Sequence, residues 1–427
     1  MPTKKISLSF LYNSITCVSL IILSALQAHS QVPGCTDPLA NNFNPSATVN
    51  NGTCTYNTTA YTPPLKVDPI SDTLIETSGL QWAANYLWSF NDGGGAAAIY
   101  RIDTLTNALL QRVYLQGAAN IDWEDIAFDG TYFYIGDFGN NANGARTDLK
   151  IYKFPLSAIP DYIASPVVTI PAAQISVINF SYSNQPQPPV PSSSNNTKFD
   201  CEAMIVDEGK IHLFTKNWID INCTHYIINS TVAGTYTATP AETLATNFLV
   251  TAADKAPGNK VVALLGYQNS GTASHFLYLL SGYTADNYFS GNKRKIDLPD
   301  VTVMGQAEGL CFKNGYYGYI SSEKFVRIIG GFPFTVTQKL RAFDIRNYVS
   351  GLLLTYIFSG NGNWDEATNW SDNLVPPPTL PANSQIVIDP LPGGACILNI
   401  SYTASAGTPI TVAAGKSFVV QGNLTQQ

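Results

Sequence analysis

Glutamate residues recur at one position of a repeated pattern. Each opens a short apolar run, in the segments Glu124-Asp125-Ile126, Glu202-Ala203-Met204 and Glu308-Gly309-Leu310. If the fold brings these carboxylates together, they cannot all stay ionised without a cation. Ca²⁺ suits such a set, because it prefers oxygen ligands and tolerates a variable number of them. The pattern therefore predicts Glu124, Glu202 and Glu308 as metal ligands, with Ca²⁺ as the cofactor.

The same glutamates also have a structural interpretation. Each would accept hydrogen bonds from backbone amides or pair with Lys216, Lys324 or Arg146. The turn from Asp137 to Arg146 also has two interpretations. It is either a ligand-binding loop or a long turn closed by an Asp137–Arg146 ion pair. Further charged residues are expected on the ligand-binding face, at strand starts or in turns, namely Asp92, Asp125, Asp137, Arg146, Lys216, Glu323 and Lys324.

No catalytic set is recognisable. The chain has no GxSxG, HExxH or P-loop motif. Beyond residue 30 its only histidines are His212, His225 and His275. This scarcity argues against a zinc enzyme and against a histidine-based catalytic triad.

These residues would be positioned by a repeat of three short strands. Its copies open at Ser78, Glu124, Glu202 and Glu308, and a weaker copy opens at Phe248. Repeats of about 40–50 residues built from antiparallel strands are typical of β-propeller blades. The sequence predicts an all-β chain with a β-propeller of about six blades over residues 65–349. Five blades with long insertions is the main alternative, and the sequence leaves seven open.

Two smaller segments flank the repeat. Residues 31–64 are turn-rich and contain only Cys35 and Cys54, so a disulfide is expected to staple this module. Residues 350–427 contain short strands at near-regular spacing, which predicts a small β-solenoid or sandwich. Cys201 and Cys223 flank one blade, and a second disulfide is expected between them.

Composition and the N-terminus indicate an exported, folded protein. Only 12% of the 427 residues are charged, 11% are aromatic and the net charge is −7. No basic patch exists, so a nucleic-acid partner is not expected. A signal peptide is predicted over residues 1–30, because Lys4 and Lys5 are followed by an apolar run and then by Ala28-His29-Ser30. The protein is therefore expected to be secreted or held at the outer surface, without a membrane span in the mature chain.

Three parts of the chain resemble known families. Residues 34–56, with GCTDP and NNGTCTY, resemble a cysteine-pair module of secreted multidomain proteins from environmental Gram-negative bacteria. The GNW…NW segment that contains Trp364 and Trp370 resembles a C-terminal module of similar bacterial proteins. Residues 65–349 loosely resemble secreted six-bladed propellers of the gluconolactonase, NHL and phytase-like kinds. The residues that carry this resemblance are Trp123-Glu124-Asp125-Ile126-Ala127, Gly136 to Asn141, Glu202-Ala203-Met204 and Glu308-Gly309-Leu310.

The propeller resemblance implies a channel calcium that activates an ester or lactone, with Glu124, Glu202 and Glu308 as its ligands. Two functions are compatible with the sequence. The first is a binding or interaction scaffold for an extracellular protein or glycan, without catalysis. The second is a calcium-dependent hydrolase of a lactone, ester or phosphoester, which works in the propeller channel.

Overall fold

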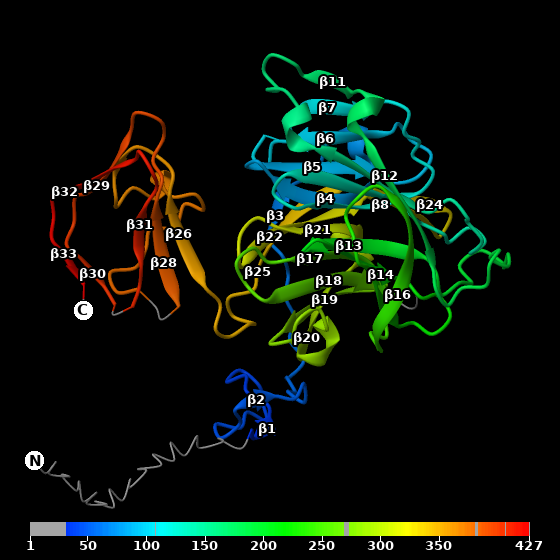
Figure 1. The fold of residues 1–427 in the computed structure, drawn as a ribbon, viewed down its shortest axis with the longest axis horizontal. Coiled ribbons are helices and arrows are strands. Elements are labelled where there is room, and N and C mark those ends of the chain that lie inside the picture. The colour runs from blue at the N-terminus through cyan, green and yellow to red at the C-terminus, as the bar shows by residue number, and fades with distance from the viewer. Residues whose placement is uncertain (1–30, 107, 269–272, 381–382, 406, 427) are drawn as a thin grey trace, which may run out of the picture.

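The protein consists of a β-propeller with a small β-rich module at each end (Figure 1). This computed structural model describes residues 31–426, except for 107, 269–272, 381–382 and 406. The predicted signal peptide therefore lies outside the described residues. Nearly all regular structure is β, which confirms the all-β propeller class predicted from the sequence.

Five strands form the inner ring of the propeller. Each contacts the next one along the chain, and the last contacts the first, so that the ring is closed. They gather around the middle of the propeller in Figure 1. These inner strands are β4 (Thr77–Ala83), β8 (Trp123–Phe128), β13 (Cys201–Asp207), β17 (Leu249–Lys255) and β21 (Gln306–Phe312).

Three further strands continue each blade outward. They are β5 (Tyr86–Asn91), β6 (Ala98–Ile102) and β7 (Leu109–Leu115) in blade 1; β9 (Tyr132–Asp137), β10 (Lys150–Pro155) and β12 (Ser176–Tyr182) in blade 2; β14 (Lys210–Thr215), β15 (Cys223–Ile228) and β16 (Gly234–Leu244) in blade 3; β18 (Val261–Tyr267), β19 (Ser274–Ser281) and β20 (Asn292–Asp300) in blade 4; and β22 (Tyr317–Glu323), β25 (Lys339–Asp344) and β3 (Leu65–Val67) in blade 5.

The described residues thus form five blades, and the expectation of about six is corrected to its five-blade alternative. Insertions account for the extra length. Strand β11 (Val167–Ile170) adds to the edge of blade 1, and the hairpin of β23 (Phe325–Ile329) and β24 (Phe332–Val336) interrupts blade 5. The outer strands β12 and β16 pair in parallel, which joins blades 2 and 3 into one eight-stranded sheet.

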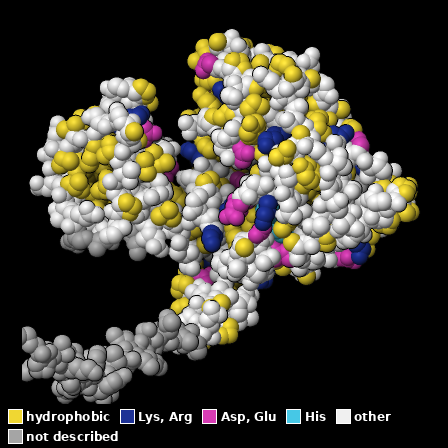
Figure 2. All heavy atoms as spheres, viewed as in Figure 1, with side chains coloured by type: hydrophobic (Ala, Val, Ile, Leu, Met, Phe, Trp, Pro, Cys, Tyr) yellow, Lys and Arg dark blue, Asp and Glu magenta, His cyan; other side chains and the backbone are white. Residues whose placement is uncertain are grey.

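Blade strands are apolar on both faces because each blade packs between two neighbours. In β5 the four central residues are all buried. Aromatic rings interlock between blades 1 and 2, where Trp88 lies 5.2 Å from Phe133 and Phe90 lies 5.4 Å from Trp123, measured between ring centroids. This packing accounts for the low charge and high aromatic content of the chain. On the face shown in Figure 2, charged side chains are sparse and gather near the middle of the propeller.

Strand β3 closes the ring. It precedes blade 1 in the sequence but pairs antiparallel with β25 of blade 5, with Val67 opposite Leu340. The helical structure of the described residues is confined to the connections. It consists of the α-helical turn α1 (Val301–Met304) and the short 3₁₀ helices η1 (Asp72–Leu74), η2 (Leu156–Ala158), η3 (Ala172–Gln174), η4 (Tyr288–Ser290) and η5 (Ala367–Asn369). Among the described helices none has the length and apolar character needed to span a membrane.

The N-terminal module is small and stapled. Strands β1 (Pro33–Gly34) and β2 (Val49–Asn50) pair in parallel beside the Cys35–Cys54 disulfide, which confirms the pairing expected from the sequence. The module rests on blade 4, where the Asn50 amide donates to Asn292 Oδ1 at 2.8 Å.

The C-terminal module is a parallel β-solenoid, and the sandwich alternative is excluded. Its sheets are β26 (Leu354–Phe358), β28 (Ser384–Ile388) and β31 (Ile410–Val412); β27 (Gly362–Asn363), β29 (Ala395–Leu398) and β32 (Ser417–Val420); and β30 (Tyr402–Ala404) and β33 (Leu424–Gln426), all paired in parallel. Trp364 and Trp370 are buried in its core. The module contacts the propeller where the Tyr316 hydroxyl donates to Asp372 Oδ2 at 2.7 Å.

The expected Cys201–Cys223 disulfide is not formed, and both thiols are free and buried. Cys201 begins β13 and Cys223 begins β15, with β14 between them in the sheet. Two strand spacings amount to about 9–10 Å, whereas bridged cysteines need a Cα separation below about 7 Å. Cys311 and Cys396 are also free.

Candidate functional site

Every inner strand carries a break in its pairing near its start. The register of the inner strand against the second strand shifts there in all five blades. Such a bulge leaves a residue unpaired and turns its side chain in a new direction. The residues within the five shifts are Ser78 with Gly79, Glu124, Glu202, Thr251 and Glu308. The repeated glutamate position seen in the sequence is therefore the bulge position of three blades.

The three glutamates line one cavity of about 220 Å³. The cavity also contains three other residues predicted for the ligand-binding face, Asp92, Lys216 and Glu323. The rest of its wall consists of Ser78, Asn141, Asn195, Trp218, Tyr267 and Gln306. Residues from all parts of the propeller, and none from the terminal modules, line this cavity, which we call the channel mouth.

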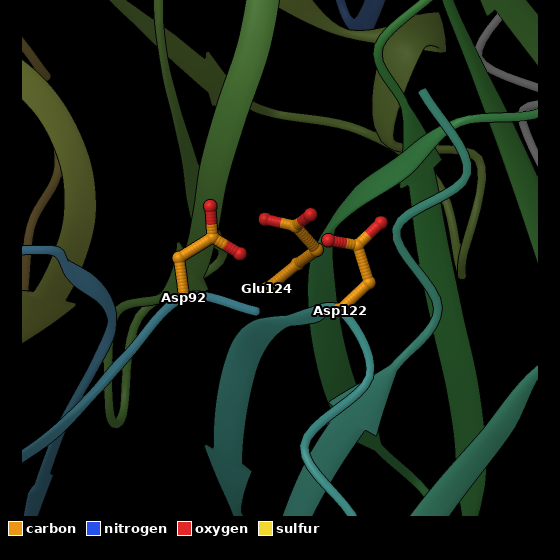
Figure 3. Close-up of side chains that lie close together, drawn as sticks. All are labelled: Asp92, Asp122 and Glu124. Carbon is orange, nitrogen blue, oxygen red and sulfur yellow. The ribbon is translucent and has the colours of Figure 1, made fainter. Parts of the chain in front are cut away.

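A first carboxylate group is formed by Asp92, Asp122 and Glu124. One oxygen of each lies within 4.8 Å of an oxygen of the other two. Figure 3 shows the three carboxylates pointing toward one another from the turn after β5 and from the start of β8. Within the described residues, no hydrogen bond reaches the carboxylate of Asp122 or Glu124. Their oxygens are therefore free for a ligand.

Burial and mutual repulsion shift the titration of this group. Burial raises the pKa of Asp122 to about 7, and the neighbouring Asp92 adds to the rise. The pKa of Glu124 is raised well above its usual value, by burial first and then by Glu202. Without a cation the group therefore retains protons near neutral pH. A divalent cation would displace these protons on binding.

Glu202, Glu308 and Glu323 line the same cavity but do not converge as the first group does, which among the described residues is the one set of three carboxylates within 4.8 Å. Glu202 has a positive partner, because Lys216 Nζ lies 3.1 Å from its Oε2 and both side chains are buried. Gln306 donates to Glu308 Oε1 at 2.7 Å. Glu308 Oε2 is buried without a hydrogen-bond partner in the described part of the chain.

The turn after β9 braces the first carboxylate group from behind. Arg146 pairs with Asp137 at 2.8 Å, which confirms the ion-pair interpretation of this turn. Arg146 also donates to the Gly139 carbonyl at 2.9 Å, and Asp137 accepts from the backbone amide of Asp122 at 3.1 Å. Asp137 and Arg146 therefore lie outside the cavity wall and hold Asp122 in place.

Two other predicted residues do not line the cavity. Asp125 is buried between blades 2 and 3, where it accepts from the Met204 amide at 2.7 Å and the Ile126 amide at 2.8 Å. Its assignment to the ligand-binding face is corrected, because the bulge at Glu124 turns Asp125 into the packing between inner strands. Lys324 is exposed outside the cavity.

Sequence reasoning missed Asp122, Trp218 and Tyr267. Asp122 lies two residues before Glu124, and its acidic character was the available signal. Trp218 lies in the turn after β14 and Tyr267 is the last residue of β18, and the sequence shows no repeated pattern at either position. The Trp218 indole donates to Asp200 Oδ2 at 2.7 Å, and Lys216 Nζ lies 5.1 Å from the centroid of its ring.

A second cavity, of about 410 Å³, is lined by residues from the other ends of the inner strands. Its charged groups are satisfied internally. Lys255 pairs with Asp207, Asp254 accepts from the Phe312 amide at 2.7 Å, and Lys313 donates to the Ser371 carbonyl at 3.1 Å. None of its described side chains has a buried polar atom without a partner. The candidate functional site is therefore the first cavity, which contains the three glutamates.

Comparisons with known proteins give no family. No protein-family model matches the chain, and no curated protein is detectably similar to it in sequence. Similar solved structures include the hydrazine synthase of Kuenenia stuttgartiensis, with 9% identity, a TM-score of 0.30, and coverage of 69% of this chain and 72% of the other.

Two further similar structures are propeller-related. A Bacteroides uniformis protein provisionally assigned as a 6-phosphogluconolactonase has 12% identity and a TM-score of 0.29, over 64% of this chain and 74% of the other. The WD40 repeats of RRP9 have 8% identity and a TM-score of 0.31, over 62% and 92%. Similarities at this level support no shared function. The propeller assignment rests on the strand pairing described above.

Proposed function

We propose that this protein is a secreted binding protein whose propeller holds a calcium ion at the first carboxylate group and binds an extracellular ligand there. One observation carries the proposal: Asp92, Asp122 and Glu124 converge within 4.8 Å, and no group in the described part of the chain forms a hydrogen bond with the carboxylates of Asp122 and Glu124. Like charges so close together are stabilised by a cation. The buried, unpaired Glu308 Oε2 across the cavity adds a further uncompensated oxygen.

The donor set favours calcium over transition metals. All three residues offer carboxylate oxygens, and neither His nor Cys belongs to the group. Zinc and copper sites in proteins generally use imidazole or thiolate ligands, whereas hard cations take oxygen. Calcium also accepts carbonyl oxygens and a variable ligand number. The amide side chains of Asn141 and Asn195 in the cavity wall are of the right kind to complete such a shell.

The rest of the cavity supports the binding role. Trp218 and Tyr267 present partly exposed rings beside amide side chains, so a ligand would meet both apolar and hydrogen-bonding surface. The chain contains no recognisable catalytic set, which favours a scaffold for an extracellular protein or glycan. The Cys35–Cys54 disulfide is consistent with an oxidising compartment, and with the signal peptide predicted from the sequence it supports secretion.

Calcium titration by calorimetry, together with thermal unfolding, tests the proposal. The protein should bind calcium and unfold at a higher temperature in its presence. Asp122→Asn and Glu124→Gln should each weaken binding at least tenfold. Glu208→Gln removes an exposed carboxylate outside the cavity and should bind calcium as the wild type does. Absence of calcium binding by the folded wild-type protein would refute the proposal.

A calcium-dependent hydrolase is the second candidate, favoured by the free Glu308 Oε2 in the cavity wall. Such a carboxyl can donate a proton to a bound molecule or accept a proton from it. The cation would polarise the ester, lactone or phosphoester bond. A screen of aryl esters, lactones and phosphoesters tests it. Turnover that is lost with chelator and in Glu308→Gln would support a hydrolase. Absence of turnover by the calcium-bound protein would rule out the hydrolase and leave binding as the one remaining candidate function.

A further inference from the structure

The wall of the channel mouth is rich in negative charge. Its described part contains one ammonium, that of Lys216, and five carboxylates, those of Asp92, Glu124, Glu202, Glu308 and Glu323. The ammonium is already engaged, because Lys216 Nζ lies 3.1 Å from Glu202 Oε2 and both side chains are buried. Behind the wall, Arg146 pairs with Asp137 and Asp148. Neither of these two cations is therefore free to pair with an anionic ligand.

A bound calcium ion would not reverse this balance. When ionised, Asp92, Asp122 and Glu124 carry three negative charges against the two positive charges of calcium. Glu323 adds acidic character to the same wall, and burial, followed by the neighbouring Glu308, raises its pKa well above the usual value. A carboxylate, sulfate or phosphate group would lose its hydration here without gaining a positive partner. The cavity therefore disfavours anionic ligands.

The cavity offers two kinds of partner to a ligand. At the first carboxylate group, calcium takes oxygen atoms with lone pairs. Elsewhere in the wall, Glu308 Oε2 is buried without a hydrogen-bond partner in the described part of the chain, and it needs a donor. The two sides lie near each other, because Asp92 contributes to the raised pKa of both Asp122 and Glu323. One small ligand can therefore contact both.

Hydroxyl groups satisfy both requirements without charge. A hydroxyl has lone pairs for a cation and a proton to donate, whereas an ammonium has no lone pair and an ionised carboxylate has no proton. Neighbouring hydroxyls of a sugar ring can also place two oxygens on one calcium ion. The partly exposed rings of Trp218 and Tyr267 supply apolar surface for the carbon skeleton of such a ligand.

The size of the cavity favours a sugar over a protein partner. Its volume is about 220 Å³, which is below the roughly 300–1,000 Å³ of pockets that hold drug-sized molecules. A protein partner, in contrast, generally buries about 800 Å² of each surface, and such an interface is not confined to one small cavity. The cavity therefore suits a single sugar unit at the end of a glycan.

We propose that the channel mouth binds an uncharged sugar unit of a glycan, whose neighbouring hydroxyls coordinate the calcium ion, and that it excludes acidic sugars. This inference rests on the proposed function, since it requires calcium at the first carboxylate group. Glu323 is then a specificity-determining residue, because it contributes acidic character to the cavity from outside that group.

Matched oligosaccharides that differ in charge test this inference. Oligomers of mannose, galactose and glucose are each compared with the corresponding uronic acid oligomers by calorimetry, in calcium and in chelator. At least one neutral oligomer should bind in calcium and lose its binding in chelator. Its uronic acid counterpart should bind at least about tenfold more weakly, because like charges at a binding surface oppose association.

A variant tests the source of this selectivity. Glu323→Gln removes a carboxylate with little change in size, and should improve binding of the uronic acid oligomer, relative to the neutral one, at least about threefold. Glu208→Gln removes an exposed carboxylate outside the cavity and should leave the selectivity unchanged. If Glu323→Gln does not fold, the comparison of oligomers with the wild type decides alone.

The outcomes separate the two proposals. A wild-type protein that binds no calcium refutes the proposed function and with it the basis of this inference. Calcium binding without binding of any neutral oligomer would leave a protein as the candidate partner and overturns the inference alone. Equal or tighter binding of the uronic acid oligomers overturns it as well, as does sugar binding that persists in chelator.

Discussion

Buried carboxylates without hydrogen bonds are costly, and their accumulation at one end of the channel is the main chemical feature of this protein. Asp122 and Glu124 are held close to Asp92 by the fold, against their mutual repulsion. At this scale the sequence predicted that the three glutamates share one cavity, because their spacing is locked to the repeat. As a common ligand set for one metal they are corrected, since only Glu124 belongs to the close carboxylate group and Glu202 pairs with Lys216. It misplaced Asp125, since no pattern in the sequence reveals that a bulge reverses the direction of neighbouring side chains.

The stability of the calcium-free protein should fall as the pH rises from 5 to 8. The pKa of Asp122 is raised to about 7 and that of Glu124 is raised as well, so the folded chain keeps protons that the unfolded chain has lost. Stability decreases with pH wherever the folded state binds more protons. The expected loss is on the order of 1–3 kcal/mol. Chemical denaturation in chelator at several pH values measures it.

Calcium should reverse this trend, because it binds the ionised carboxylates. The stabilisation by a fixed calcium concentration should therefore grow between pH 5 and 8. In Asp122→Asn the dependence on pH should become shallower in chelator, since one titrating group is gone. Stability that is constant or rises over this range in the calcium-free wild type would contradict the account.

At the scale of elements, bulges and one tight turn create the site. The bulges of blades 1, 2, 3 and 5 each place a side chain in the cavity wall, whereas that of blade 4 turns Thr251 toward the Ala307 carbonyl. The turn after β9 brings Gly139 against the first carboxylate group. Sequence periodicity located the strands and the shared glutamate position. It could not locate Trp218, in the turn after β14, or Tyr267, at the end of β18, because neither position repeats from blade to blade.

Gly139→Ala should weaken calcium binding. A Cβ at this position would overlap Glu124 Oε1 and lie 2.5 Å from Asp122 Oδ2, so both carboxylates would have to move. We expect affinity to fall at least tenfold, which corresponds to about 1.4 kcal/mol. Gly95→Ala is the matched control, because its Cβ would meet no atom closer than 3.8 Å. Equal calcium affinity in the two variants, measured by calorimetry, would show that the turn does not position the group.

At the scale of the whole molecule, a closed ring of five blades brings distant residues to one cavity. The sequence predicted a propeller but about six blades, since the extra strand β11, the β23–β24 hairpin and long loops occupy the length of another blade. The parallel pairing of β12 with β16 also depends on tertiary packing, so local strand propensity does not predict it. Ring closure depends on β3, which comes from the opposite end of the propeller sequence.

Removal of β3 should destabilise the propeller. A variant that begins at Asp68 lacks the pairing of Val67 with Leu340 and exposes the edge of β25. Its unfolding temperature should fall by at least about 5 °C. A variant that begins at Tyr61 lacks the disulfide-stapled module but keeps β3, and should lose much less. Similar losses in the two truncated proteins, measured by thermal unfolding, would mean that the terminal module stabilises the ring and β3 does not.

The central claim is that the first carboxylate group binds a hard cation. The most direct measurement is a crystal structure of the protein with terbium, a trivalent substitute for calcium, with its anomalous scattering mapped. The account predicts a strong peak between the carboxylates of Asp92, Asp122 and Glu124, and none between Glu202 and Glu308. A map without a peak at the first group, from crystals in which the propeller is intact, would contradict it.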